Sequence, residues 1–366
     1  MNKPIVIIVI DGFDPEYIQA CNTPNLDEVY SKGFLKVGRC MMPSVTNVNN
    51  VSLVTGLYPE SHGINCNYWL DTETGRETYM ESADFILAET LFQKADRLGK
   101  RTLMVSSKDK LRTLIGAGAT VAFSSEQPLD QIVSVLGDPP PIYSLEVNGW
   151  IVRAADHLMS ESFFDVVYIA TTDYAMHTYP PGHPESQRHM TILDDTIGEL
   201  LSHHPDAALL LTADHGMSTK ERMVDLRAAL EARCIPSNPV PIIKDRYVLQ
   251  HSNLGGCTFV YLDDRHQAEA LAILRETPGV HSALSREEAV KEYRLHAGRL
   301  GNIFVNAEKN VVFGDPTQIA MRPGLRSHAS IHERTIPIIA YNSDLDPAGI
   351  EENRHLGQYA LSKLLS

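Results

Sequence analysis

Basic residues are in short supply in this sequence. Of its 366 residues, 32 are lysine or arginine and 46 are aspartate or glutamate, which gives a formal net charge of −14 at pH 7. Because nucleic-acid phosphates select basic surfaces, this balance excludes an overall nucleic-acid-binding face. A small anionic substrate would instead require a local pocket of cations.

Cysteine is also scarce. The five cysteines are odd in number and share no short spacing of the kind that metal ligands use; they are Cys21, Cys40, Cys66, Cys234 and Cys257. This pattern fits reduced thiols in a cytoplasmic protein, and we expect most of them to act as small buried side chains.

Long hydrophobic runs are absent. The N-terminal run PIVIIVI has seven apolar residues before Asp11, and no small-residue cleavage site follows it. It is too short to span a membrane and is not a convincing signal peptide, so we expect no membrane partner.

Short apolar runs are present in their place, and they are continuous rather than alternating. They are PIVIIVI (4–10), RTLMVSS (101–107), FFDVVYIA (163–170), AALLLTA (207–213) and TIPIIAY (335–341). Continuous runs are typical of parallel strands buried on both faces. Helical patterns lie between them, at 83–100, 149–159 and 190–204. The alternation predicts an α/β fold with a doubly wound, mostly parallel sheet flanked by helices.

The pattern changes between residues 220 and 320. Segments such as CTFVYLDD, AEALAILRET and NIFVNAEKNVVFG predict the strands and helices of a smaller α+β unit. We interpret 220–320 as a cap inserted into a catalytic core formed by 1–219 and 321–366.

Reactive side chains follow the predicted core strands. Asp11 comes after the first run, Lys108 after the second, Asp173 after the third and Asp214 after the fourth. In sheets of this kind ligands bind at the carboxyl ends of the strands. We therefore expect these side chains to meet at one edge of the sheet.

Acids and imidazoles accumulate at this predicted edge. The stretch TTDYAMH places Asp173 and His177 four residues apart, ADHGM contains Asp214 and His215, and RSHAS contains His328. Taken singly, each could form a hydrogen-bonded or capped turn. Together they supply enough carboxylate oxygen and imidazole nitrogen for two metal ions, and such ligands are the ones catalytic zinc prefers.

Thr46, in MPSVTNVNN, is the candidate nucleophile. It lies at the expected N-terminus of a helix that runs to about Gly56, where free N–H groups and the helix dipole favour an anion. A hydroxyl placed on a metal there would be activated for attack on phosphorus. The alternative for Thr46 is a helix N-cap, a role that Ser44 could fill instead.

The motifs IDGF, PSVTNVNN, TGLYPESHGI, TTDYAMH, ADHGM and RSHAS occur in the order found in the alkaline phosphatase superfamily. The sequence resembles its nucleotide pyrophosphatase/phosphodiesterase-like branch and, within that branch, the phosphonoacetate hydrolase family. The resemblance implies two zinc ions, one held by Asp173, His177 and His328 and the other by Asp11, Asp214 and His215. It also implies that Thr46 is the nucleophile and contacts the second ion.

The sequence departs from this pattern beside the last ligand. Relatives usually have glycine after the last ligand histidine, and this chain has Ala329. His332, four residues after His328, is an alternative last ligand.

Lys108 and Lys110, in SSKDKLRTL, bear on the substrate. If the segment is extended, both ammonium groups point to one side, although surface lysine pairs are usually only solvated. The spacing resembles the clamp with which phosphonoacetate hydrolases hold the substrate carboxylate, and Asn67 matches the residue that binds a phosphonyl oxygen. The resemblance implies a small anionic phosphonate substrate, cleaved to acetate and phosphate through a phosphothreonine intermediate.

Two other hypotheses stay open. A phosphodiesterase or nucleotide pyrophosphatase on the same metal frame would need no lysine pair, and Tyr68, Trp69 and Tyr174 could form its aromatic slot. A binding module stabilised by zinc would use the same ligands structurally, although structural zinc sites are usually rich in cysteine. The sequence leaves the oligomeric state open, with a homodimer among the alternatives.

Overall fold

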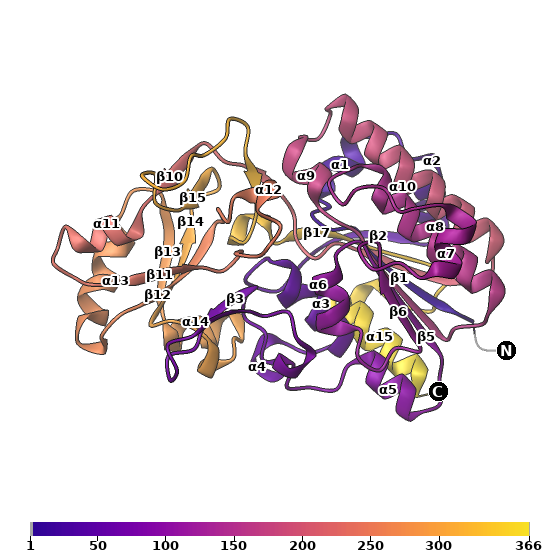
Figure 1. The fold of residues 1–366 in the computed structure, drawn as a ribbon, viewed down its shortest axis with the longest axis horizontal. Coiled ribbons are helices and arrows are strands. Elements are labelled where there is room, and N and C mark those ends of the chain that lie inside the picture. The colour runs from indigo at the N-terminus through magenta and orange to yellow at the C-terminus, as the bar shows by residue number, and fades with distance from the viewer. Residues whose placement is uncertain (1–2, 366) are drawn as a thin grey trace.

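A seven-stranded sheet forms the centre of the larger part of the molecule (Figure 1). The structure is a computed structural model that describes residues 3–365. The strand order is β2-β17-β8-β1-β7-β5-β6. The strands are β1 (Ile5–Val9), β2 (Phe34–Arg39), β5 (Thr102–Ser106), β6 (Val121–Ser124), β7 (Val166–Ala170), β8 (Ala208–Thr212) and β17 (Thr335–Tyr341).

The mostly parallel sheet is confirmed. β1 pairs in parallel with β7 and β8, and β5 pairs in parallel with β6 and β7. The five apolar runs all form strands, but the parallel assignment of TIPIIAY is wrong, because β17 runs antiparallel to both β8 and β2. The edge strands β2 and β6 were not predicted. β2 alternates between half-buried and exposed residues, so it lacks a continuous apolar run.

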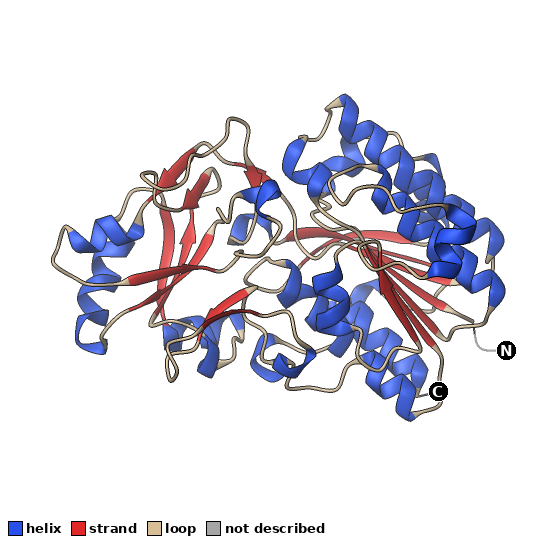
Figure 2. Ribbon diagram, viewed as in Figure 1, coloured by secondary structure: helices blue, strands red, loops and turns tan. Residues whose placement is uncertain are grey.

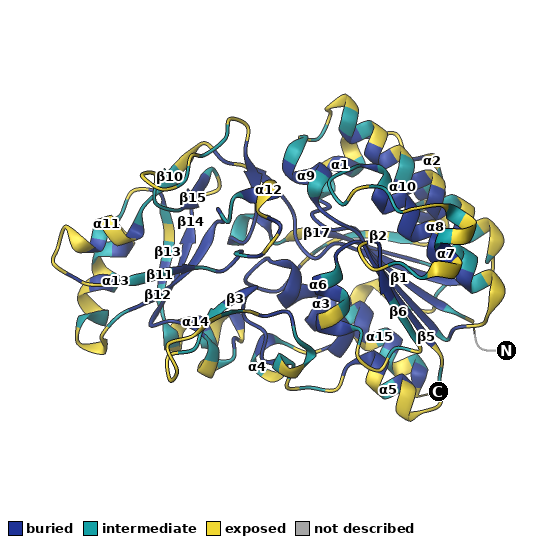
Figure 3. Ribbon diagram, viewed as in Figure 1, coloured by how far each residue is buried: buried dark blue, intermediate teal, exposed yellow. Residues whose placement is uncertain are grey.

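Helices cover both faces of this sheet, as Figure 2 shows. One face packs against α1 (Pro15–Ala20), α2 (Pro24–Lys32), α7 (Asp130–Leu136), α8 (Glu146–Glu161) and α10 (Pro184–His203). The other packs against α3 (Thr46–Thr55), α5 (Leu91–Arg97), α6 (Asp109–Ile115) and α15 (Arg354–Leu364). Successive side chains of β1 enter the two clusters alternately, with Val6 in one and Ile7 in the other. The inner strands β1, β5, β7 and β8 are therefore buried along their whole length, as Figure 3 shows.

The predicted helices 149–159 and 190–204 lie almost entirely within α8 and α10. The helix predicted at 83–100 is wrong in extent. Only a 3-10 turn (Ala83–Phe85) and α5 are helical there, because Thr90 and Gln93 form a capping box that starts the helix at Leu91.

A second sheet lies to one side of the first. It is antiparallel, with the order β11-β12-β14-β13. Its strands are β11 (Asn238–Pro241), β12 (Cys257–Tyr261), β13 (Val280–Ser285) and β14 (Ile303–Ala307). The helices near it are α11 (Leu226–Glu231), α12 (Val248–His251), α13 (Gln267–Glu276) and α14 (Arg286–Tyr293).

The second sheet contributes to two hydrophobic clusters. Val260 and Ile303 pack with α11 and α13, whereas Phe259 and Phe304 belong to the same cluster as Val48 of α3. The remaining short strands are β3 (Tyr68–Leu70), β4 (Glu77–Tyr79), β9 (Ser218–Thr219), β10 (Arg222–Val224), β15 (Val311–Phe313) and β16 (Arg326–Ser327). Across residues 3–365, no helix combines the length and apolarity needed to cross a bilayer.

Two further short helices complete the set near the first sheet, α4 (Pro59–His62) and α9 (Tyr174–Thr178). α9 begins directly after Asp173 and contains His177, so the turn that follows β7 carries both side chains toward the same place.

Candidate active site

The sheet brings the predicted acids together. β1 lies between β7 and β8, so Asp11, Asp173 and Asp214 follow three neighbouring strands that point the same way. All three carboxylates are buried, with 2% or less of each residue exposed. A buried carboxylate needs a cation or several hydrogen bonds to offset its lost hydration.

Two groups of side chains have ligand atoms close enough to hold a metal ion. Asp173, His215 and His328 form one, and Asp11, Asp214 and His215 form the other. The second group is the set predicted for one zinc. In the first, His215 stands where the sequence suggested His177, so His215 is common to both groups.

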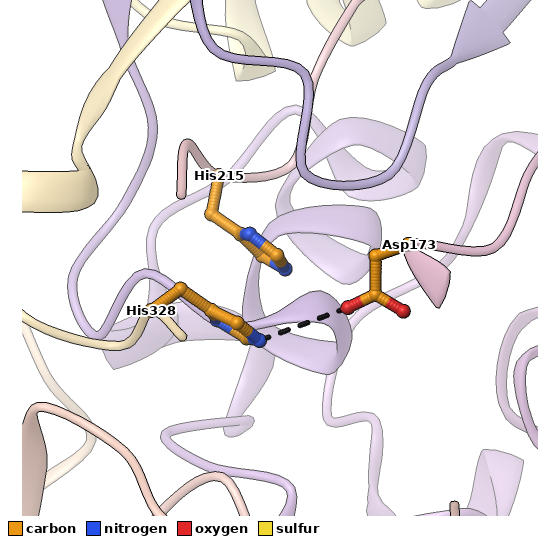
Figure 4. A group of neighbouring side chains, drawn as sticks. All are labelled: Asp173, His215 and His328. Atoms are coloured by element: carbon orange, nitrogen blue, oxygen red, sulfur yellow. Dashed lines mark ion pairs between the residues drawn. The ribbon is translucent and has the colours of Figure 1, made fainter. Parts of the chain in front are cut away.

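Figure 4 shows how the first group converges. The rings of His215 and His328 stack at 3.5 Å between centroids and 8° between planes, and both point toward the Asp173 carboxylate. His328 Nε2 lies 3.8 Å from Asp173 Oδ2. His177 adjoins the group, because its Nε2 lies 2.9 Å from the same oxygen.

The donor atoms in these groups fit a metal. Asp11 Oδ1, His177 Nε2 and His215 Nε2 are buried and make no well-directed hydrogen bond within residues 3–365. Their nearest opposite atoms belong to the same groups, with His215 Nε2 3.2 Å from Asp11 Oδ1 and His177 Nε2 2.9 Å from Asp173 Oδ2. His215 Nδ1 contacts the carbonyl of Gly216 and His328 Nδ1 that of Ser44, at 2.9 and 2.7 Å. A backbone carbonyl that holds Nδ1–H leaves Nε2 as the lone-pair donor, which is the usual arrangement of metal-binding histidine.

The electrostatics of the site also favour cations. Burial and the Asp11 charge raise the pKa of Asp214 to about 7. Burial disfavours a proton on His215, but Asp214 and Asp11 outweigh it and raise the pKa of His215 to about 9. Burial and the two neighbouring imidazoles lower the pKa of His328 well below its usual value. The buried carboxylates therefore favour the binding of a cation between them.

Thr46 is the first residue of α3, as predicted, and is buried. Neither it nor Ser44 caps the helix, because Val45 is the N-cap residue and the Ser44 hydroxyl donates to the carbonyl of Ser330. The capping alternative is therefore wrong. Asn67 lies beside Thr46, since its Oδ1 accepts from the N–H of Asn47 at 3.2 Å.

Asn50, which the sequence analysis missed, connects this helix to the acids. Its Nδ2 donates to the Thr46 carbonyl at 2.9 Å and lies 3.5 Å from Asp214 Oδ2. The hydroxyl of Tyr168 on β7 donates to Asn50 Oδ1 at 2.6 Å. The repeated asparagines of TNVNN were the available signal, because buried amides need fixed partners.

The loop after β16 (Arg326–Ser327) places His328 in the site and His332 outside it. The His332 ring packs against His281 at 4.8 Å between centroids and is only partly buried. The sequence favoured His328, because RSH at 326–328 fits the pattern of the family that it resembles, and left His332 as the alternative. Burial and the contact with Asp173 favour His328.

Lys108 and Lys110 are both buried, so the solvated alternative is wrong. The extended conformation assumed for them is also wrong, since Lys108 precedes α6 and Lys110 lies in its first turn. They nevertheless meet the same ring, with ammonium nitrogens 5.6 and 5.3 Å from the centre of Tyr247.

The two lysines have different partners. Lys108 Nζ lies 2.6 Å from Asp173 Oδ1 and 3.1 Å from Asp11 Oδ2, so it bridges the two groups of ligands. Burial opposes its charge, yet Asp11 and Asp173 raise the pKa of Lys108 well above its ordinary value. Lys110 instead forms an ion pair with Asp245.

Asp245 and Tyr247 were missed by the sequence analysis. Both are buried and belong to the segment between β11 and β12. Asp245 Oδ1 accepts from the N–H of Tyr247 at 2.7 Å and lies 3.2 Å from His251 Nε2. Nothing in the local sequence places this segment beside Lys110, because the contact spans 135 positions.

The aromatic residues proposed for a base-binding slot have separate neighbours. Tyr174 packs against Tyr143 at 5.7 Å, and Tyr68 packs against Tyr79 at 5.0 Å between centroids. Trp69 has the guanidinium of Arg299 as its neighbour. This arrangement gives no support to a slot built from Tyr68, Trp69 and Tyr174 together.

Comparison with known proteins identifies the family. The model of the type I phosphodiesterase/nucleotide pyrophosphatase family matches residues 5–330. The structure is similar to phosphonoacetate hydrolase from Sinorhizobium meliloti 1021 in complex with phosphonoformate, with a TM-score of 0.91 and 31% identity. That match covers 99% of this chain and 96% of the other. A complex of the same enzyme with phosphonoacetate matches at a TM-score of 0.91 and 30% identity.

More distant relatives share the fold. Human ectonucleotide pyrophosphatase/phosphodiesterase 5 matches with a TM-score of 0.73 and 16% identity, covering 99% of this chain and 95% of the other. Venom phosphodiesterase of Naja atra is 26% identical over 227 residues, which are 59% of this chain. The match covers only 26% of the venom protein. The human protein and phosphonoacetate hydrolase belong to the alkaline phosphatase superfamily, which is metal-dependent.

Proposed function

The chain belongs to the type I phosphodiesterase/nucleotide pyrophosphatase family, and we propose that it hydrolyses phosphonoacetate to acetate and phosphate at a site holding two zinc ions. It is an enzyme of the alkaline phosphatase superfamily that resembles phosphonoacetate hydrolase. The observation that carries the proposal is the pair of buried lysines, Lys108 and Lys110, beside two groups of metal-ligand residues.

The proposed ligands are Asp173, His177 and His328 for one ion, and Asp11, Asp214 and His215 for the other, with Thr46 contacting the second. The buried donor atoms that make no well-directed hydrogen bond, Asp11 Oδ1, His177 Nε2 and His215 Nε2, support this assignment. When bound, paired zinc ions polarise the phosphonyl oxygens and lower the pKa of a hydroxyl or water.

Thr46 is the proposed nucleophile. The Thr46 hydroxyl releases its proton to solvent, and its oxygen forms a bond to phosphorus while the carbon–phosphorus bond breaks. The electron pair of that bond passes to the acetate fragment as an enediolate. A proton from solvent converts the enediolate to acetate, and water then hydrolyses the phosphothreonine to release phosphate. Asn67, whose amide adjoins the Asn47 N–H, is the proposed partner of a phosphonyl oxygen.

The lysines supply what the leaving group needs. An ammonium has three hydrogen-bond donors. Within residues 3–365, Lys108 donates two hydrogen bonds to carboxylates and Lys110 donates one. Three N–H donors of this buried pair therefore have no hydrogen-bond acceptor among these residues. A substrate carboxylate can accept them, and fixed cations stabilise its negative charge as the enediolate develops.

We propose that residues 220–320 act as a cap on a core formed by 1–219 and 321–366. The cap segment that carries Asp245 and Tyr247 reaches Lys110 and covers both ammonium groups. A cytoplasmic location belongs to the same proposal, supported by five cysteines that all have free thiols.

Metal content is the first test. We expect about two zinc ions per chain by elemental analysis, because two adjacent groups of ligand residues can each hold one ion. Treatment with a chelator should abolish phosphate release, and added zinc should restore it. Full activity in protein that contains one ion or none would contradict the paired site.

Substrate comparison is the second test. Lys110→Met should lower kcat/KM for phosphonoacetate by about ten- to a hundredfold, the effect of losing one charge-assisted contact. Hydrolysis of a nitrophenyl phosphodiester, which has no carboxylate, should change little. Lys108→Met should lower both activities, because Lys108 also contacts Asp11 and Asp173. A wild-type protein that cleaves only the diester would instead establish the phosphodiesterase alternative.

A further inference from the structure

A second buried ion pair lies outside the proposed ligands and the lysine clamp. Lys220 Nζ is 3.0 Å from Glu333 Oε1, and both side chains are fully buried. Burying an ammonium and a carboxylate costs hydration that their attraction only partly returns. The proposed chemistry uses neither residue, so their position requires another explanation.

Glu333 holds the loop that carries His328. Its Oε2 accepts from the Ser330 N–H at 3.0 Å and from the Ser330 hydroxyl at 2.6 Å. The Ser330 carbonyl in turn accepts from Ser44, whose own carbonyl contacts His328 Nδ1. One carboxylate oxygen therefore fixes the backbone two residues beyond the histidine.

The other side of Glu333 holds the loop that carries His215. Its Oε1 accepts from the hydroxyl of Ser218, and its main-chain carbonyl accepts from the Gly216 N–H at 2.7 Å. Residues 218–219 (β9), which follow His215, pair antiparallel with residues 326–327 (β16), which precede His328. Glu333 thus touches both loops whose imidazole rings stack at 3.5 Å in the site.

The same pair reaches the cap. Lys220 Nζ donates to the carbonyl of Lys309 at 2.9 Å, and the Ser218 hydroxyl oxygen lies 3.1 Å from the same carbonyl. Lys309 lies in the turn between β14 and β15, so the ion pair joins the cap to both ligand loops.

We propose that Lys220 and Glu333 are positioning residues that set the spacing of His215 and His328 and connect the cap to the metal centre. This inference rests on the proposed metal site. It predicts that loss of the pair distorts metal coordination even where the fold is intact.

The test compares Lys220→Met, Glu333→Gln and the double variant, each stripped of metal and titrated with Co²⁺. Each single change leaves one buried charge without its partner, so both should lower Tm. The double change removes both charges and should recover much of that Tm. Its Co²⁺ affinity should still be about tenfold below that of the wild type, with an altered visible spectrum, because groups that orient ligands tune the metal.

The double variant and the wild-type protein each offer a result that would overturn the inference. Wild-type Co²⁺ affinity and spectrum in the folded double variant would make the pair purely structural, while the proposed function would stand. Wild-type protein that binds no Co²⁺ and no Zn²⁺ would instead defeat the proposed function itself. If the double variant does not fold, Ser218→Ala, which removes one contact with Glu333, should alter the spectrum; an unchanged spectrum would reject the inference.

Asp194→Asn is the matched control. Asp194 is a buried carboxylate that accepts from the N–H groups of Asn25 and Leu26 at 3.1 and 2.8 Å, on α2 rather than on a ligand loop. It should lower Tm and leave Co²⁺ affinity and spectrum unchanged. A control that shifts the spectrum as much as Ser218→Ala would show that any loss of stability disturbs the site, which would also reject the inference.

Discussion

Ala329, which follows His328, adopts a φ of +93°, a conformation that suits glycine. The residue is fully buried, so the packed residues around it keep its backbone from relaxing to another conformation. Ala329→Gly should raise the free energy of unfolding by about 1 kcal/mol, measured by urea denaturation. As a control, Ala340→Gly in β17, where φ is not positive, should lower it by about the same amount. Equal effects in both variants would contradict the assignment of strain.

Replacement of Thr46 distinguishes attack on phosphorus by its hydroxyl from direct attack by hydroxide. Thr46→Ala should abolish phosphonoacetate hydrolysis and leave zinc content and Tm near normal, because it removes a hydroxyl and one methyl group. Thr46→Ser should retain part of the activity, since it keeps the oxygen but loses the restriction on its rotamer. Single-turnover assays of phosphate release check both. Undiminished activity in the alanine variant would mean that a hydroxide attacks directly.

Helices α3 and α15 cross in unusually close contact. A Cβ added at Gly357 of α15 would lie 1.7 Å from the carbonyl oxygen of Leu53 in α3, so the helices would have to separate. Gly357→Ala should cost roughly 1–3 kcal/mol of stability, and it should lower kcat because Thr46 moves with α3. Urea denaturation and steady-state assays test this. Gly349→Ala, where a Cβ meets nothing within 4 Å, should change neither.

The whole molecule should lose stability in mild acid. Burial lowers the pKa of His62 to about 3 and that of His189 to about 4, so both are neutral when folded. Below pH 6.5 the unfolded chain binds protons that the folded chain does not, and each histidine then costs about 1.4 kcal/mol per pH unit. For each histidine, this loss of stability stops when the pH falls to the pKa that the histidine has in the folded protein.

The measurement is the free energy of unfolding between pH 8 and pH 4.5, in metal-free protein. Above pH 6.5 the raised pKa values of His215 and Asp214 should make stability fall as the pH rises toward 8. Below pH 6.5 the two neutral histidines should make stability decline, and Asp214 offsets only part of that decline. His62→Asn should lower stability at pH 6.5, because it breaks the 2.8 Å contact with Ser52, and should make the decline in acid less steep. An unchanged slope would show that other groups cause the decline.

The sequence alone determined the central sheet and the location of the candidate site. Continuous apolar runs specified the buried strands, and parallel strands align their carboxyl ends, so Asp11, Asp173 and Asp214 had to meet. Edge strand β2 was not predicted, because a half-exposed strand lacks such a run. The direction of β17 was predicted wrongly, because the hydrophobic pattern of a strand indicates its burial and not whether it runs parallel or antiparallel to its neighbours.

Only the tertiary structure decided which side chains complete the site. Lys108 touches two proposed ligands whereas Lys110 pairs with Asp245, a difference that two lysines in one motif could not reveal. Glu333 joins the loops of His215 and His328 although 118 positions separate it from His215. Local sequence specifies strands because their pattern repeats every few residues. Contacts between distant loops depend on how the chain closes in space, and no local pattern records that.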